Sequence, residues 1–228
     1  MREVVIYVEG PGDLILITHL LDFHFQINLK VDDSQLSGDV NENGLKLVVR
    51  VFDVDSGNGG IDSRKIRELV EEIKRTNIPL GIKSALIIDT DTPDHSNPKG
   101  GFAHRKNYLN DLCDGTDISY FLVPNNQDDG NLETLLDEIV SANGLPYYRC
   151  LQGFITCLAI LKGEQIPPKL VGKHWEKTKL EWYAFNMDGS NSRNPVRNYQ
   201  DGDLWDLNAI SLNPLREFLA QIIAHEAL

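Results

Sequence analysis

The apolar residues of this chain come in short runs, separated by segments with a helical pattern. Four runs predict strands: Glu3–Val8, Lys46–Val54, Ser84–Ile88 and Ile118–Val123. Helices are predicted at Asp13–Phe25, Ser63–Thr76, His104–Cys113 and Leu132–Val140; Ile66, Leu69, Val70 and Ile73 recur at helical spacing. Strands that alternate with helices favour a mostly parallel sheet with right-handed crossovers. We therefore expect an α/β, Rossmann-like fold with a four-stranded sheet flanked by helices.

Two segments depart from this alternation. Residues 26–45 are polar and rich in Gly and Asn, which predicts a loop or a small excursion. From about Leu145 the pattern changes to helix and loop, and Pro214–Leu228 closes the chain as an amphipathic helix. The pattern predicts an α/β domain over residues 1–144, with a helical C-terminal extension over residues 145–228 packed on it.

Composition and charge narrow the class of protein. The chain has 228 residues, 41% of them hydrophobic, and a formal net charge of −12. This charge counts against a protein that coats nucleic acid, but it allows an enzyme with a local basic groove and a metal. No apolar run is long enough to cross a bilayer, and the N-terminus does not resemble a signal peptide. The three cysteines are odd in number and lack metal-ligand spacing, which favours free thiols in a reducing compartment. We therefore expect a cytoplasmic protein, and we expect no membrane partner.

Acidic residues follow two of the predicted strands. Glu9 and Asp13 come after the first strand, and Asp89 and Asp91 come after the third. Because parallel strands end at one edge of the sheet, these carboxylates should gather there. They would repel one another unless a divalent cation joined them. Carboxylate oxygens suit Mg²⁺ or Mn²⁺, so we expect a site for one of these ions that handles phosphate.

Simpler structural roles stay open for these residues. Asp13 also suits the first turn of a helix, where a carboxylate complements the helix dipole. Asp89 and Asp91 also suit a turn rich in Asp, Thr and Pro. A calcium loop of the EF-hand type is excluded, because its sixth and twelfth positions would hold Asp94 and Gly100.

The two acidic motifs together resemble those of TOPRIM domains. A strand that ends in Glu-Gly-x-x-Asp (Glu9 to Asp13) precedes a later strand that ends in Asp-x-Asp (Asp89 to Asp91). The resemblance implies a TOPRIM-like fold in which Glu9 is the general acid/base, Asp89 and Asp91 hold magnesium, and Asp13 is an accessory acidic residue. It also makes Glu133 an additional metal ligand. The other interpretation of Glu133 is a first-turn helix residue that caps locally with Asn131.

Two longer segments extend this resemblance. FLVPNNQDDGNLETLLDEI and DGDLWDLNAISLNPLREFL are similar to those of a poorly characterised, stand-alone, TOPRIM-related bacterial family. That family has links to the overcoming-lysogenization-defect nucleases, which join an ATPase to their TOPRIM unit. The present sequence has no Gly-x-x-x-x-Gly-Lys-Ser/Thr motif, so ATP-driven control would need a separate ATPase subunit or complex partner. The oligomeric state stays open.

Substrate contacts require groups that bind phosphate. The backbone N–H groups of Gly10 and Gly12 and the side chains of Arg105 and Lys106 are candidates. Lys169–Tyr183 mixes basic and aromatic residues, which suits either a nucleic-acid groove or an amphipathic helix with its aromatic side chains in the core. We expect Mg²⁺-dependent phosphodiester hydrolysis, or a related nucleotidyl or phosphoryl transfer on nucleic acid. The alternative is a non-catalytic TOPRIM-fold binding or regulatory module in a larger complex.

Overall fold

A computed structural model describes residues 2–31, 37–42, 44–52, 63–93, 100–162, 177–184 and 198–224. The chain divides into two compact units. The first contains Met1–Leu132 together with Leu212–Leu228, and the second is the intervening stretch Glu133–Ser211. This division differs from the predicted one at residue 144, because the closing segment belongs with the first unit.

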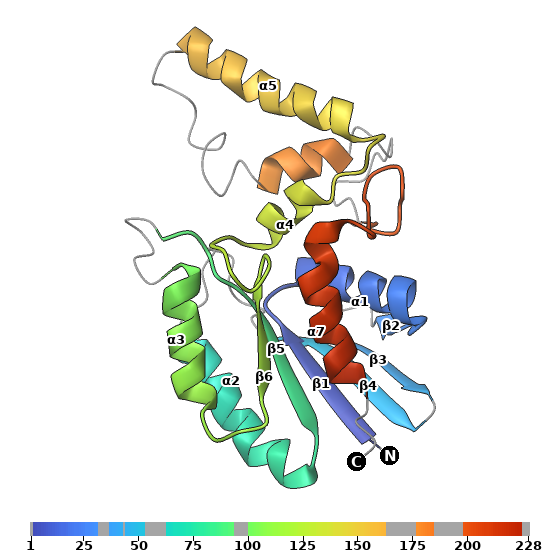
Figure 1. Cartoon of the computed structure of the whole chain (residues 1–228), viewed down its shortest axis with the longest axis vertical. Helices are drawn as coiled ribbons and strands as arrows, with labels where there is room; N and C mark the ends of the chain where they lie inside the picture. Colours follow the sequence, from blue (N-terminus) through green and yellow to red (C-terminus); the bar gives the residue numbers. More distant parts are fainter. Residues whose placement is uncertain are drawn as a thin grey trace. The chain divides into compact units, whose positions relative to one another are not determined.

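The first unit is built on a sheet in which four adjacent strands are parallel (Figure 1). They are β1 (Arg2–Val8), β4 (Leu45–Val51), β5 (Lys83–Asp89) and β6 (Ser119–Val123), in the order β4-β1-β5-β6. All four correspond to predicted strands. The predicted α/β, Rossmann-like architecture, with a parallel four-stranded sheet flanked by helices, is confirmed.

Two further strands extend the sheet beyond β4. They are β2 (Lys30–Val31) and β3 (Ser37–Glu42), and each pairs antiparallel with its neighbour. Both fall in the segment for which a loop or small excursion was predicted. The polar sequence of β3 lacks the alternation of apolar residues that marks a strand. Its strand conformation follows from backbone pairing with β4, from Ser37 opposite Arg50 to Glu42 opposite Leu45.

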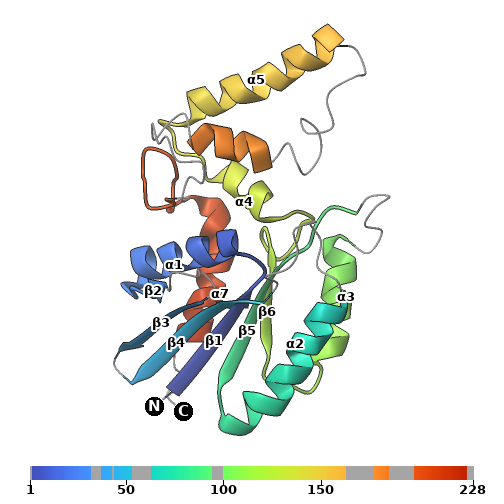
Figure 2. The same cartoon turned by 180° about the vertical axis from the view of Figure 1, so that it is seen from behind.

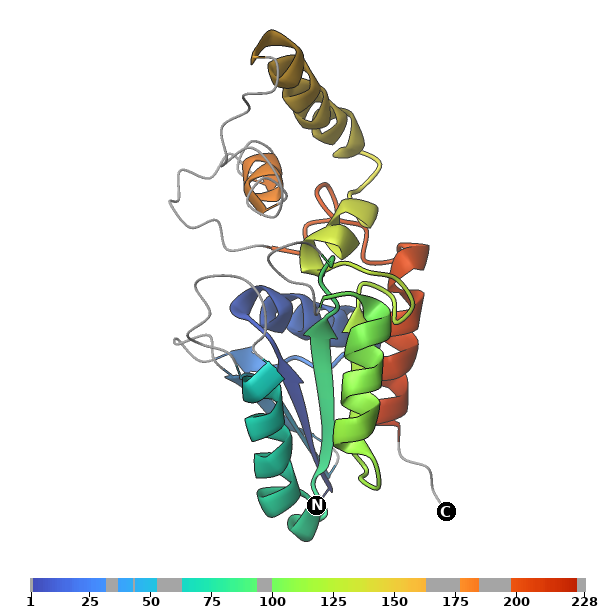
Figure 3. The same cartoon turned by 90° about the vertical axis from the view of Figure 1, so that its left-hand side faces the viewer.

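Helices cover both faces of this sheet. They are α1 (Pro11–Phe25), α2 (Ser63–Thr76), α3 (Phe102–Cys113) and α7 (Asn213–Ile223), with a short turn, η1 (Ile78–Leu80), before β5. Side chains of a strand alternate between the two faces. Val5 and Leu86 therefore share a core with Val70 of α2 and Leu109 of α3. Helices α1 and α7 contact one another, and the strands lie between α2 and α7 (Figure 3).

Side chains from strands β1 and β5 hold the C-terminal end of helix α7. The Arg2 guanidinium donates to the carbonyl oxygens of Ile222 and Ile223, at 2.7 Å each. The Lys83 ammonium donates to the carbonyl of Gln221 at 3.2 Å. These cations satisfy carbonyl groups that the last turn of a helix leaves unpaired, and their charge complements the helix dipole. The closing helix therefore completes the core of the α/β unit.

The described part of the second unit is mainly helical. Its helices are α4 (Leu132–Glu138), α5 (Leu145–Lys162) and a helix over residues 177–184, all visible from the opposite side in Figure 2. Lys179, which is 6% exposed, donates to Asp137 at 2.6 Å and lies over the ring of Tyr148. The Tyr148 hydroxyl also donates to Asp137. Buried polar contacts thus hold the three helices together.

Candidate functional site

The topology of the sheet brings the ends of β1 and β5 together. After β1, the chain runs through α1 to strands β2, β3 and β4, which lie on one side of β1 in the sheet. Strand β5 pairs with β1 on its other side. This reversal of direction is a topological switch point, where open α/β sheets bind their ligands beyond the carboxyl ends of the strands. Glu9 directly follows β1, and Asp89 is the last residue of β5. The backbone N–H of Asp89 donates to Glu9 Oε2 over a long 3.4 Å contact, so the two predicted site residues are neighbours.

The electrostatic environment of Glu9 is unusual for a carboxyl group. Burial raises its pKa well above the ordinary value of 4.5, and the nearby charges of Asp13 and Asp91 raise it further. The backbone N–H of Asp89 and the charge of Arg105 act in the opposite direction. A carboxyl group with a raised pKa can carry a proton closer to neutral pH, which suits an acid or base in catalysis.

Asp13 has the local role that was the alternative to metal binding. It is the third residue of α1, after the cap residue Gly10 and the first helical residue, Pro11. Its Oδ2 atom accepts a hydrogen bond from the Gly10 N–H at 3.0 Å. This contact engages one of the two backbone groups predicted to bind phosphate. Gly12, the other one, lies in the first turn of the helix.

Asp91 lies in a turn after β5, with its carboxylate turned to α3. Its Oδ2 atom is 3.4 Å from Nη2 of Arg105, and the residues are 5% and 2% exposed, respectively. Arg105 was predicted to contact substrate phosphate from the surface; the structure instead buries it against Asp91. Lys106, the next residue, is exposed, and its ammonium lies 5.1 Å from the centre of the Phe102 ring. Of the two basic candidates, Lys106 alone is accessible.

Thr90 contributes to the site in a way that the sequence did not suggest. Its buried hydroxyl accepts the N–H of Gly130 at 2.7 Å and lies within 3.2 Å of the carbonyl oxygens of Val123, Asp128 and Gly130. Asp129 of the same loop accepts the N–H of Phe102 at 2.6 Å, at the start of α3. No local pattern signals that Asp129 caps a helix 27 residues away.

The remaining candidates lie elsewhere in the chain. Glu133 occupies the first turn of α4 and belongs to the second unit, so it is described apart from the strand ends. In the basic and aromatic stretch, Lys179 and Tyr183 are buried, whereas Trp182 is 40% exposed. This described part of the stretch serves internal packing. Residues 169–176 of the predicted groove, and a second Asp-x-Asp at Asp53 and Asp55, lie outside the described residues.

The donor set limits which metal could bind. Among the residues that the structure describes, no group of three or more His, Cys, Asp or Glu side chains is arranged as a set of metal ligands. Mg²⁺ nevertheless needs only one or two carboxylates in proteins, because it keeps several waters and takes substrate phosphate oxygens as further ligands. Asp89, a hard oxygen donor at the end of β5 and a neighbour of Glu9, fits an ion of this kind.

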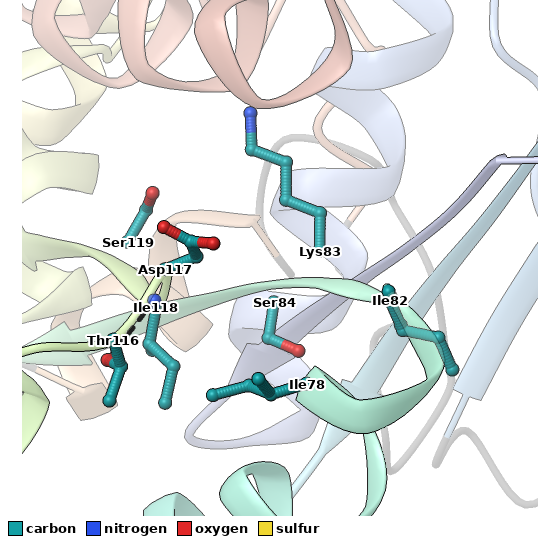
Figure 4. A pocket seen from close by; sticks show the side chains of 9 residues that line it. Ile78, Ile82, Lys83, Ser84, Thr116, Asp117, Ile118 and Ser119 are labelled. Atoms are coloured by element: carbon teal, nitrogen blue, oxygen red, sulfur yellow. Dashed lines mark hydrogen bonds between the residues drawn. The ribbon is translucent and has the colours of Figure 1, made fainter.

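A pocket of about 570 Å³ lies at the other end of the strands (Figure 4). Lys83 and Ser84 at the start of β5 line it, together with Asp117 and Ser119 before and at the start of β6. The Lys83 ammonium points toward α7, where it donates to Gln221. Since ligands of open α/β sheets bind at the carboxyl ends of the strands, this pocket is a different place from the switch point.

Within the described ranges, no helix combines the length and apolar character needed to span a bilayer. None of the curated proteins matches the chain. A solved structure, a hypothetical protein, PH0156, from Pyrococcus horikoshii OT3, is similar with 16% sequence identity and a TM-score of 0.47, over 98% of this chain and 100% of the other. The model of a family described as "Protein of unknown function (DUF3226)" matches residues 3–224. The chain therefore belongs to the DUF3226 family.

Proposed function

We propose that the chain hydrolyses phosphodiester bonds of nucleic acid with the help of Mg²⁺ or Mn²⁺, at a TOPRIM-like site. The observation that carries this proposal is the contact between Glu9 and Asp89 at the switch point of the sheet. Two acidic residues, one directly after β1 and one at the end of β5, are neighbours where folds of this class place their ligands. A nucleotidyl or phosphoryl transfer would use the same groups with a different nucleophile.

Each residue of this site has a role that follows from its surroundings. A bound divalent cation would neutralise charge on the phosphate and activate a water molecule. Asp89, at the strand end, would hold the ion. Glu9, whose pKa is raised by burial and by Asp13 and Asp91, would transfer the proton. Lys106, exposed on α3, is the accessible candidate for a substrate phosphate.

A cleavage assay tests this proposal directly. The protein is incubated with single- and double-stranded DNA and with RNA, in the presence of Mg²⁺, Mn²⁺ or EDTA. We expect metal-dependent cleavage that falls by about 10²–10⁴-fold in Glu9→Gln, because general acid–base catalysis contributes about this much. Asp89→Asn should be similarly impaired. Asp111→Asn, which removes an exposed carboxylate from α3, is the matched control. Cleavage that is equal in all variants, or absent in the wild type, would reject the enzyme.

A second function is favoured by a specific observation: the protein's own groups already engage acidic residues of the site. Asp91 pairs with Arg105, and Asp13 accepts from Gly10. Together with the net charge of −12, these contacts suit a non-catalytic binding or regulatory module within a larger complex, to which a separate ATPase could belong. Such a module would show no cleavage alone and would co-purify with its partner. Full activity without a partner would exclude it.

A further inference from the structure

Arg105 is a charged side chain in an unusual position for its type. It lies on the inner face of α3, in helical register with the buried residues Leu109 and Cys113. Burying a guanidinium is unfavourable unless an opposite charge compensates it. Asp91 supplies that charge across 3.4 Å, and both side chains are almost inaccessible to solvent. The pair is therefore a fixed part of the fold and not a surface contact that forms and breaks freely.

The backbone of Asp91 is held as firmly as its side chain. Its φ angle of 58° lies in the left-handed region, which Asp adopts more readily than most residues. Its carbonyl oxygen accepts the N–H of Gly101 at 3.2 Å, directly before α3. It also forms a bridge with Gly130, which Thr90 binds as well. Asp91 thus joins the end of β5 to the start of α3 and to the loop after β6.

These contacts divide the two aspartates of the Asp-x-Asp motif. Asp89 ends β5, beside Glu9, and Asp91 faces a buried cation from α3. The Oδ2 atom of Asp91 already faces the guanidinium, so a metal ion at that oxygen would have to compete with a buried arginine. Losing this ion pair in a place almost inaccessible to solvent would be unfavourable.

We propose that Arg105 is a positioning residue: it holds the carboxylate of Asp91 and fixes the turn after β5, so that Asp89, beside Glu9, is the aspartate of the motif that a divalent cation meets. This inference rests on the function proposed above, because it assigns roles within the same site. It changes the role of Asp91 from a metal ligand to the anchor of the turn. The site would then take one ion, with Arg105 in place of a second positive charge.

Mn²⁺ titration of the purified full chain, followed by calorimetry or by electron paramagnetic resonance, tests this proposal. The decisive variant is Arg105→Lys, which keeps the charge but loses the planar fork that fixes the carboxylate. We expect one Mn²⁺ per wild-type chain and binding about 10-fold weaker in Arg105→Lys, since groups that orient metal ligands have effects of about this size. Arg67→Lys makes the same exchange at an exposed position of α2 and should bind as the wild type does.

Thermal unfolding without metal supplies the second measurement and remains informative if a variant folds poorly. Asp91→Asn should lower the melting temperature, because it removes the carboxylate charge that faces buried Arg105, whereas Asp89→Asn should not. Unchanged or tighter Mn²⁺ binding in Arg105→Lys would overturn the proposal, since Asp91 would then act as a ligand that arginine restrains. Two bound ions per wild-type chain would overturn it as well, with the proposed function intact. No Mn²⁺ binding by the wild type would reject both.

Discussion

Glu9 links the electrostatics of the site to the stability of the protein. Burial, followed by the charges of Asp13 and Asp91, raises its pKa in the folded state well above 4.5. The unfolded chain ionises near the ordinary value, so between the two pKa values the folded state holds a proton that the unfolded state has lost. The free energy of unfolding therefore falls as the pH rises through this interval, and the loss is complete above the folded-state pKa.

Glu9→Gln should consequently stabilise the protein at high pH. The amide carries no charge and keeps an oxygen that can accept from the Asp89 N–H. We expect a higher melting temperature at pH 8, by about 2–4 °C for each 1 kcal/mol of relieved penalty, and little change near pH 4.5. Melting curves between these two pH values measure the effect, with Asp111→Asn as the control. A shift that is the same at both pH values would show that charge on Glu9 is not its cause.

The Thr90 hydroxyl offers a test of the network around Asp91. Thr90→Val keeps the shape of the side chain but leaves the Gly130 N–H without its acceptor in a buried place. An unsatisfied buried group of this kind costs about 1–3 kcal/mol. We expect a lower free energy of unfolding in urea for Thr90→Val, and a value near that of the wild type for Thr90→Ser. Equal stability of the valine variant would show that the hydroxyl does not hold the loop.

Individual residues show how far the sequence predicts the site. The pairing of Glu9 with Asp89 followed from strand ends alone, because parallel strands end at one edge. The burial of Arg105 had a signal that was available: Arg105, Leu109 and Cys113 are spaced by four and share one helix face. Its basic neighbours suggested the surface instead. The roles of Thr90 and Asp129 depend on contacts between distant segments, which no local pattern encodes.

At the scale of elements, the helices and strands of the α/β unit follow closely from apolar periodicity. The predicted helix Ser63–Thr76 has the observed bounds, and α1 begins two residues earlier than predicted, at Pro11. Proline suits the first turn of a helix because its missing N–H would be unpaired there. Strand β3 could not be predicted from its own polar sequence, since pairing with β4 supplies its stability.

The second unit contains a close contact that constrains one element. A Cβ atom at Gly144, just before α5, would overlap the hydroxyl of Tyr183, which donates to Leu204 at 2.7 Å. We expect Gly144→Ala to be destabilising by at least about 1–3 kcal/mol, because an overpacked side chain must move. Gly153→Ala within α5 meets open space and should stabilise by about 0.5–1 kcal/mol through helix propensity. Urea unfolding of both variants measures these changes in the free energy of unfolding. Equal changes for Gly144→Ala and Gly153→Ala would contradict the close contact between Gly144 and Tyr183.

For the whole molecule, the division of the chain makes a prediction about α7. This helix lies at the end of the sequence, yet it completes the unit that contains the first strand. Leu219 of α7 is fully buried, so Leu219→Ala should lower the free energy of unfolding by about 2–5 kcal/mol. Ile210→Ala, at a position 83% exposed, should change it by less than about 0.5 kcal/mol. Similar losses for the two variants would contradict a core role for α7.

The central claim is that a divalent cation binds where β1 and β5 end. Anomalous diffraction from crystals soaked in Mn²⁺ locates the ion directly, and the same soak of Asp89→Asn crystals is the matched control. The account predicts one peak at the carboxylate of Asp89, beside Glu9, with Asp91 still paired to Arg105, and no peak in the variant. A peak held by Glu133 alone, or no peak at the strand ends of the wild type, would contradict it.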